Sequence, residues 1–219
     1  MNIAQRIAQL KNRMDSSVTL VAVSKGQSKE AIIEAHQTGL MDFAENYVQE
    51  ALLKIKALAD LRLIWHFIGP IQSNKTKIIA THFSWAQSIT RAEIAKKLND
   101  ARPQNLPPLK ICIQVNLEAS NNKSGLSPKD AIQLVPYLLS LPQLALQGLM
   151  TIPEPHDDQT TLYNLYISLH DLLKTINQTH NINLTTLSMG MSHDFITAID
   201  AGSTMVRIGE GIFGARSLL

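Results

Sequence analysis

Short apolar runs alternate along the chain with longer stretches in which apolar residues recur every three or four positions. The short runs contain many β-branched residues, which is typical of strands buried on both faces of a parallel sheet. The longer stretches have the spacing of amphipathic helices. Strands are predicted at residues 19–25, 41–44, 63–68, 84–89, 110–115, 145–150, 185–188 and 204–208.

The predicted strands alternate with predicted helices, and one further helix, with apolar residues from Ile3 to Met14, precedes the first strand. Eight such units favour a closed (β/α)8 barrel. The alternative is an open doubly wound sheet, which needs fewer strands and usually shows G-x-G-x-x-G after its first strand; this chain does not. We therefore expect residues 1–219 to form a single α/β domain, a (β/α)8 TIM barrel with an N-terminal helix.

Polar residues mark the expected starts of several helices. Ser28 is expected to cap the helix after the first strand, and Ser127 precedes Pro128, a residue favoured at the first helical position. Thr90 and Glu93 have the spacing of a capping box. Ser192 is placed to cap the helix after the seventh strand. These caps predict where the loops that follow the strands end.

Composition narrows the class of protein. Hydrophobic residues make up 45% of the chain, which is ordinary for a globular protein. The net charge of +2 comes without a basic block, so we expect no nucleic-acid partner. No apolar run is long enough to span a membrane, and no membrane partner is expected. The single cysteine, Cys112, lies in an apolar run and fits a reducing compartment, so a cytoplasmic location is expected.

Lys25 follows the first apolar run directly. In parallel α/β folds, ligands and catalytic groups gather at the carboxyl ends of the strands. A lysine there is a candidate for imine chemistry, which requires that its pKa of about 10.4 be lowered by burial or by a neighbouring cation. The alternative is a lysine that closes the strand and reaches solvent. This stretch alone favours the alternative.

Two glycine-containing segments follow the seventh and eighth strands, at residues 190–192 and 208–211. In (β/α)8 barrels, these two loops often bind phosphate, because glycine lets backbone N–H groups approach an anion. Glycine is common in such turns without any ligand, so each loop alone is a weak signal. Together with Lys25, the two loops indicate a ligand that is a phosphate-bearing aldehyde or ketone.

Other candidate residues have simpler interpretations. His66 alternates with large apolar residues inside a strand, which favours a hydrogen-bonded core histidine over an acid or base, and no metal site is predicted around it. Met191 is expected to serve packing. Arg207 lies between Val206 and Ile208 on a buried strand, where an unpaired guanidinium is costly. We therefore expect Arg207 to face a ligand or an acid.

Several longer motifs resemble the pyridoxal-phosphate homeostasis protein family. They are residues 21–25, FAENYVQE at 43–50, WHFIGPIQSNK at 65–75, KSGL at 123–126, GLMTIP at 148–153, SMGMSHDF at 188–195 and GSTMVRIG at 202–209. The resemblance spans nearly the whole chain. It implies the barrel of the alanine racemase N-terminal domain, and it implies a protein that holds pyridoxal 5'-phosphate (PLP) as a Schiff base.

The resemblance also implies the cofactor-binding residues. Lys25 becomes the Schiff-base lysine, and Arg207 faces the pyridine nitrogen. Asn46 lies near the ring, and His66 and Met191 are second-tier pocket residues. The phosphate cradle consists of Ser192, Gly209 and the backbone of Glu210. No catalytic residue is implied, and possible partners besides PLP are PLP-dependent apoenzymes.

The chain departs from the family pattern in three places, one of which is residues 215–219, which lack the acidic-aromatic finish common in the family. Gln27 stands where many relatives carry a second lysine, and Glu210 stands where a small residue is common. The carboxylate of Glu210 leaves the cradle intact if it turns outward, because only its N–H is needed. We expect a monomer that serves PLP homeostasis, by storage or delivery, without turnover of its own.

Two enzyme hypotheses remain as alternatives to the homeostasis role. Alanine racemases that resemble this barrel need a second domain with a tyrosine base, and we expect this chain to stop at the barrel. A Schiff-base aldolase would use Lys25 directly on a sugar phosphate and would bind its substrate only transiently. A PLP-binding protein, in contrast, should purify with the yellow colour of its cofactor.

Overall fold

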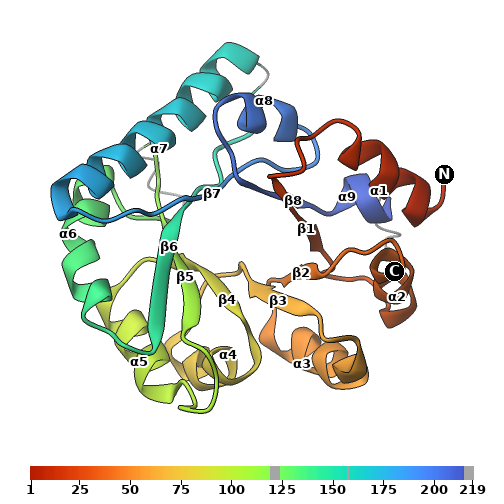
Figure 1. Cartoon of the computed structure of the whole chain (residues 1–219), viewed down its shortest axis with the longest axis horizontal. Coiled ribbons are helices and arrows are strands. Elements are labelled where there is room, and N and C mark those ends of the chain that lie inside the picture. Colours follow the sequence, from red (N-terminus) through yellow and green to blue (C-terminus); the bar gives the residue numbers. More distant parts are fainter. Residues whose placement is uncertain (119–123, 157, 215–219) are drawn as a thin grey trace.

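Eight parallel strands close into a barrel in the order of the chain (Figure 1). The structure is a computed structural model that describes residues 1–118, 124–156 and 158–214. Closure is set by β1, which pairs with both β2 and β8. The strands are β1 Thr19–Val23, β2 Asp42–Glu45, β3 Ile64–Phe67, β4 Trp85–Ile89, β5 Leu109–Gln114, β6 Leu144–Met150, β7 Thr186–Ser188 and β8 Met205–Ile208. The predicted barrel is confirmed, and the open sheet is wrong.

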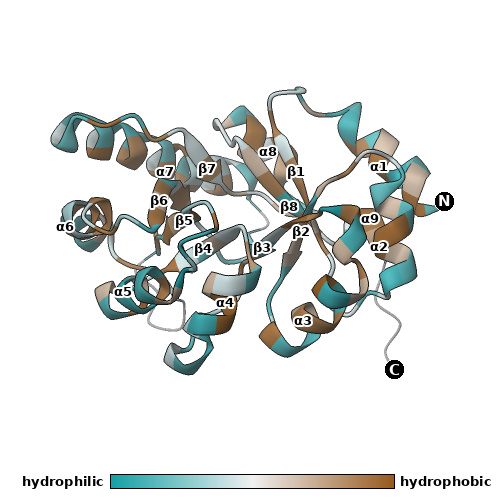
Figure 2. Cartoon of the chain, turned by 60° about the horizontal axis from the view of Figure 1, so that its bottom comes forward, coloured by the Kyte–Doolittle hydropathy of each residue, from teal (hydrophilic) through white to brown (hydrophobic). Residues whose placement is uncertain are grey.

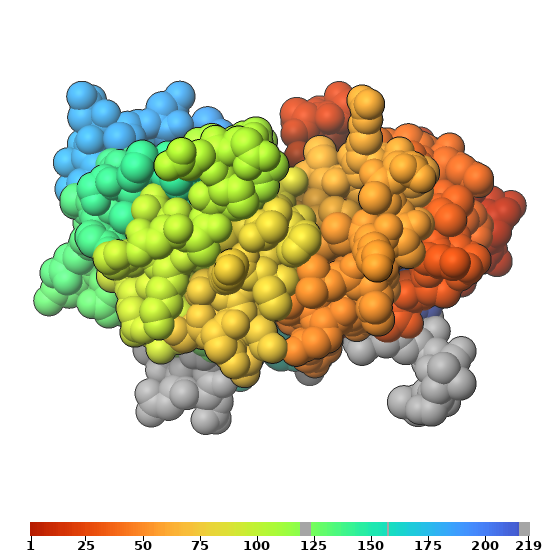
Figure 3. Space-filling model, turned by 90° about the horizontal axis from the view of Figure 1, so that it is seen from below, coloured from red at the N-terminus to blue at the C-terminus, as the bar shows by residue number. Residues whose placement is uncertain are grey.

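The helices form a ring around these strands (Figure 1). The longest of those described, α7, lies along the outer side of β6 and β7, and α1 lies beside α9. Their bounds are α1 Ile3–Lys11, α2 Lys29–His36, α3 Val48–Ala57, α4 Thr76–His82, α5 Ala92–Ala101, α6 Pro128–Leu139, α7 Gln159–His180, α8 Phe195–Asp200 and α9 Glu210–Phe213, with 3-10 turns at Ala59–Leu61 and Ser73–Lys75. Figure 3 shows α3, α4 and α5, coloured from orange to yellow-green, side by side in the outer wall.

The apolar core has two parts, because successive side chains of a strand point to opposite faces of the sheet. One part fills the space between the strands and the helices, where the rings of Phe67 and Phe83 meet edge to face at 5.4 Å. Figure 2 shows the matching pattern on α3 and α5, which carry both hydrophobic and hydrophilic residues. The other part lines the barrel interior, here called the lumen. It includes Val21, Ala44, Trp85, Cys112, Met150 and Met205.

Two of the four predicted caps are confirmed. Ser28 Oγ accepts from Ala31 N, and Ser127 Oγ accepts from Asp130 N. The other two predictions are wrong. Helix α5 begins at Ala92 without a side-chain cap, and Glu93 pairs with Lys97 on the surface instead of reaching back. Helix α8 begins after Asp194, so Ser192 lies outside it.

The described part of the chain contains no helix that is long and apolar enough to cross a membrane. Lys123, which begins one of the family-like motifs, lies outside the described residues. Cys112 is fully buried, as expected, and burial raises the pKa of its thiol to about 12. The thiol therefore stays protonated and unreactive.

Candidate functional site

Most of the predicted site residues lie at the carboxyl ends of β1, β2 and β8. Lys25 lies two residues beyond β1, and Asn46 and Gly209 follow β2 and β8 directly. Strand pairing brings these ends together, because Val23 is opposite Ala44 and Ala22 is opposite Ile208. A small cavity of about 70 Å³ joins the lysine to the turn after β8; it is lined by Val23, Lys25, Gln27, Gly209, Glu210 and Gly214.

Ser192 connects the two glycine-containing loops. Its Oγ accepts a hydrogen bond of 3.1 Å from Gly211 N, so the loop after β7 is tied to the first turn of α9. Gly211 is required at this point, because a Cβ there would lie 2.8 Å from Ile208 and 3.6 Å from Ser192 Oγ. The structure thus brings the two predicted phosphate loops together.

Asp194 fixes the loop that carries Met191 and Ser192. Its Oδ1 accepts from Met191 N, and its Oδ2 accepts from the hydroxyl of Tyr166 on α7 at 2.8 Å. Burial, followed by the negative charge of Asp194, raises the pKa of Tyr166, so this hydroxyl remains a donor. This role could not be predicted from the sequence, because Tyr166 is 28 positions from its partner.

The side chain of Glu210 turns outward. It is 58% exposed and its Oε2 lies 3.7 Å from His193 Nε2 on the surface. Its backbone N–H remains part of the turn that begins α9. The carboxylate of Glu210 therefore points away from the predicted phosphate cradle, although a small residue is common at this position in the family.

Lys25 lies on a turn whose backbone is held on both sides. On one side, Lys54 Nζ on α3 donates to Ser24 O at 2.6 Å. On the other side, Gly26 N donates to Glu50 Oε1 at 2.5 Å. Lys54 and Glu50 also pair with each other at 2.5 Å. The position of Lys25 is therefore set from helix α3, which sequence reasoning did not reveal.

Glu45 completes this group, which we call the outer network: Ser24, Glu45, Glu50 and Lys54. Glu45 is fully buried between the sheet and α3, and its Oε1 accepts from Ser24 Oγ at 2.6 Å and Lys54 Nζ at 2.8 Å. Burial raises the pKa of Glu45, although Lys54 and Ser24 oppose the shift. Its Oε2 has no hydrogen-bond partner among the described residues.

Arg207 lies in the lumen and is 2% exposed. Its Nη1 donates to Ser188 Oγ at 2.7 Å, and its Nη2 donates to Thr151 O at 2.9 Å. Both acceptors are uncharged, so no acid makes these contacts. Burial lowers the pKa of Arg207. That Arg207 faces a ligand stays a prediction.

His66 is a buried, hydrogen-bonded core histidine, as predicted. Its ring stacks on Trp85 with centroids 5.3 Å apart. Its Nε2 lies 2.9 Å from Asp42 Oδ1, and its Nδ1 lies 2.8 Å from Gln87 Nε2. Burial lowers the pKa of His66. The described residues contain no group of three or more side chains able to hold a metal ion.

Asn46 carries a buried amide oxygen, Oδ1, without a hydrogen-bond partner among the described residues. A buried acceptor left unpaired costs roughly 1–3 kcal/mol. The backbone of Asn46 packs tightly on Gly69, where a Cβ would lie 2.3 Å from Asn46 O. Asn46 follows β2, which pairs with β1, so its amide lies at the same end of the barrel as Lys25 and has an acceptor to offer to a ligand.

Comparison with known proteins gives consistent results. The model of the family described as alanine racemase, N-terminal domain, matches residues 1–217. The pyridoxal phosphate homeostasis protein of Pseudomonas aeruginosa is 49% identical over 98% of this chain and 93% of its own length. The Escherichia coli K12 protein of the same name is 42% identical over 98% of this chain and 97% of its own.

Solved structures extend the comparison. PipY of Synechococcus elongatus PCC7942, in its structure with PLP bound, is 36% identical, has a TM-score of 0.91 and is matched over 97% of this chain and 100% of its own. Alanine racemase of Clostridium difficile has a TM-score of 0.79 at 13% identity, over 98% of this chain and 57% of its own. At that identity, the likeness shows the fold alone.

Proposed function

The chain belongs to the family described as alanine racemase, N-terminal domain, and on that premise we propose that it is a PLP-binding protein of intracellular PLP homeostasis. Relatives of 42% to 49% identity over almost the full chain carry the name pyridoxal phosphate homeostasis protein. The PipY structure with PLP bound has the same fold at 36% identity. These likenesses support both the ligand and the role.

The observation that carries the proposal is the bridge from Ser192 Oγ to Gly211 N at the end of the barrel where Lys25 lies. It brings together two glycine-containing loops suited to a phosphate and a lysine suited to an aldehyde. The unpaired Oδ1 of Asn46 adds an acceptor nearby. PLP contains both the phosphate and the aldehyde, so the residues present fit this cofactor.

We assign the roles accordingly. Lys25 Nζ condenses with the aldehyde of PLP, with release of water, and Asn46 lies near the ring. Ser192 Oγ and the N–H groups of Gly209 and Glu210 hold the phosphate, and Met191 borders the pocket from the loop that Asp194 fixes. Arg207 faces the pyridine nitrogen. His66 belongs to a second tier, because its own hydrogen bonds go to Asp42 and Gln87.

Arg207 also supports binding without turnover. PLP supplies an electron sink to enzymes when a carboxylate keeps its ring nitrogen protonated. A guanidinium only donates hydrogen bonds and stays charged, so it favours the unprotonated nitrogen and a weaker sink. We therefore propose storage or delivery of PLP, with PLP-dependent apoenzymes as recipients. A racemase-like activity is the second candidate, because the matching family is described as alanine racemase, N-terminal domain.

The test of the proposal is the visible spectrum of the purified protein, followed by borohydride reduction and peptide mass spectrometry. We expect one reduced PLP adduct, on Lys25, and none in Lys25→Ala. Lys75, which lies in a 3-10 turn after β3, serves as the internal comparison. An adduct on Lys75 with Lys25 unmodified would overturn the assignment.

A further inference from the structure

A continuous hydrogen-bond chain crosses the lumen from Arg207 to the opposite end of the barrel. Arg207 Nη1 donates to Ser188 Oγ at 2.7 Å, and Ser188 Oγ donates to Gln87 Oε1 at 2.6 Å. Gln87 Nε2 lies 2.8 Å from His66 Nδ1, and His66 Nε2 lies 2.9 Å from Asp42 Oδ1. We call these five residues the lumen network. They come from β8, β7, β4, β3 and β2.

The two ends, together with the orientation of the Gln87 amide, set the direction of the bonds in the lumen network. Arg207 can only donate and the carboxylate of Asp42 can only accept. Ser188 therefore accepts from Arg207 and gives its own proton to Gln87 Oε1. The amide N–H of Gln87 then points to Nδ1 of His66, which must be unprotonated. The proton of a neutral imidazole is left on Nε2, where it donates to Asp42.

Burial keeps water away from the middle of the network, where Gln87 Nε2 also donates to Met205 Sδ at 3.2 Å. Ser188, Gln87 and His66 are each 0% exposed. Burial lowers the pKa of His66, which agrees with a neutral ring. Donors and acceptors that all point one way also polarise one another in a low dielectric. The orientation of each group therefore depends on its neighbours, up to the guanidinium.

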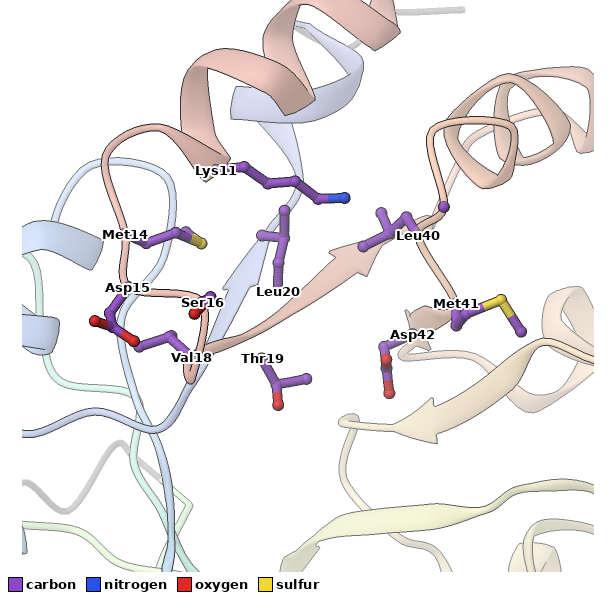
Figure 4. A pocket seen from close by; sticks show the side chains of 11 residues that line it. Lys11, Met14, Asp15, Ser16, Val18, Thr19, Leu20, Leu40, Met41 and Asp42 are labelled. Atoms are coloured by element: carbon purple, nitrogen blue, oxygen red, sulfur yellow. The ribbon is translucent and has the colours of Figure 1, made fainter.

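The far end of the network reaches solvent. Asp42 begins β2, and its side chain is 22% exposed. It borders a cavity of about 480 Å³ at the amino ends of β1 and β2, together with Lys11, Asp15 and Met41 (Figure 4). Water can thus hydrate the carboxylate, while the groups behind it remain dry.

We propose that Asp42, His66, Gln87 and Ser188 are positioning residues that orient the guanidinium of Arg207 toward the ring nitrogen of bound PLP. The inference rests on the proposed function, which places Arg207 against that nitrogen. The four residues touch no cofactor themselves. Their effect is to hold the buried guanidinium through uncharged groups, so that its remaining N–H donors face the ligand, while Asp194 contributes a negative charge nearby.

The test compares PLP with its 1-deaza analogue, which has a carbon in place of the ring nitrogen. Ser188→Ala removes the acceptor nearest to Arg207, and we expect PLP affinity to fall about tenfold, the effect of one hydrogen bond to a charged group. Affinity for the deaza analogue should change far less, because that ligand offers Arg207 no acceptor. Equal losses for both ligands would overturn the proposal.

Ser203→Ala is the matched control. Ser203 is also buried, and its hydroxyl bonds to the backbone, at 2.7 Å to Met189 O, outside the lumen network. It should leave both affinities unchanged. If unaltered protein fails to bind PLP at all, the proposed function fails. If it binds PLP and Ser188→Ala matches Ser203→Ala, only the positioning role fails.

A second measurement begins with the unaltered protein, so its main result does not depend on whether a variant folds. The nitrogen-15 NMR spectrum of histidine-labelled protein should show His66 neutral, with the proton on Nε2. Asp42→Asn keeps an acceptor for that proton and should preserve this tautomer, whereas Asp42→Ala should shift the Nε2 signal. A proton on Nδ1 in the unaltered protein would reverse the direction of the network and overturn the inference.

Discussion

The two cations of the site are held in opposite ways. Lys25 lies on a half-buried turn, and the outer network holds that turn through its backbone, with charged side chains of α3 and a buried Glu45. Arg207 is buried in the lumen, and the lumen network holds it through its guanidinium, with a hydroxyl, an amide and an imidazole. The outer network contains paired charges. The lumen network contains a carboxylate only at the end far from Arg207, at Asp42.

This difference matches the roles that we propose for the two residues. A lysine that forms an imine needs a movable side chain on a fixed backbone, so its supports are best placed behind the turn. An arginine that presents a fixed donor to a ring needs its planar group fixed. Paired acids beside Arg207 would reduce the charge that it offers to a ligand. The hydrogen bonds that hold its guanidinium go to uncharged acceptors, Ser188 Oγ and Thr151 O, while Asp194 acts on it without such a bond.

The largest expected effect comes from breaking the outer network. Lys54→Met leaves Glu45 buried without its ammonium partner, and removal of one partner from a buried ion pair costs about 3–5 kcal/mol. Urea unfolding of the apoprotein should show this loss. Lys97→Met is the control, because Lys97 pairs with Glu93 on the surface and should change little. Similar small effects of both variants would show that the outer network does not stabilise the turn.

The phosphate loops give the next largest effect. Ser192→Ala removes one hydrogen bond to a charged group, which contributes roughly 1.5–3 kcal/mol, so PLP should bind about tenfold or more weakly. Pyridoxal, which lacks the phosphate, should bind almost as before. Titrations of absorbance with the two ligands separate these outcomes. Ser192 does not begin α8, but its Oγ accepts from Gly211 N in α9, so an equal loss for both ligands would show that it acts through that bond and would contradict its phosphate role.

A smaller, pH-dependent effect is expected at Glu45. Burial raises its folded-state pKa above the ordinary value of 4.5, so the folded protein binds this proton more tightly than the unfolded chain. The stability that it contributes is therefore fully present below pH 4.5 and is lost as pH rises through the folded pKa. Glu45→Gln abolishes this dependence.

Denaturant unfolding of both proteins at several pH values above 4.5 measures the difference. The unfolding free energy of Glu45→Gln, relative to the parent, should improve as the pH rises. A relative stability that worsens over this range would mean that Glu45 is ionised at its ordinary pKa or below. That outcome would contradict a folded-state pKa raised by burial and would show that the pairing with Lys54 outweighs the burial of Glu45.

The barrel could be predicted from the sequence because each strand is marked by its own local apolar run. Lys25 and Arg207 could be singled out for the same reason, since each is a cation next to such a run. The caps at Thr90 and Ser192 failed because a two-residue signal does not determine which residue begins a helix.

The networks that hold the two cations could not be predicted. The outer network joins β1, β2 and α3, and the bond from Ser188 to Gln87 spans 101 positions. Gln87, Asp42 and Lys54 stand in no motif that marks a site, and strand closure alone brings them to their partners. Their roles depend on the register of neighbouring strands, which the local pattern of a single strand does not contain.

The central claim is that this barrel holds PLP by Lys25 and Arg207 without amino-acid chemistry of its own. Its most direct test is α-proton exchange of single L-amino acids in D2O, followed by proton NMR with the purified, PLP-loaded protein. We expect exchange no faster than with free PLP at the same concentration, because a guanidinium in the place that we propose for Arg207 would leave the ring nitrogen unprotonated. Multiple turnovers well above free PLP, abolished by Lys25→Ala, would contradict the claim and favour a racemase.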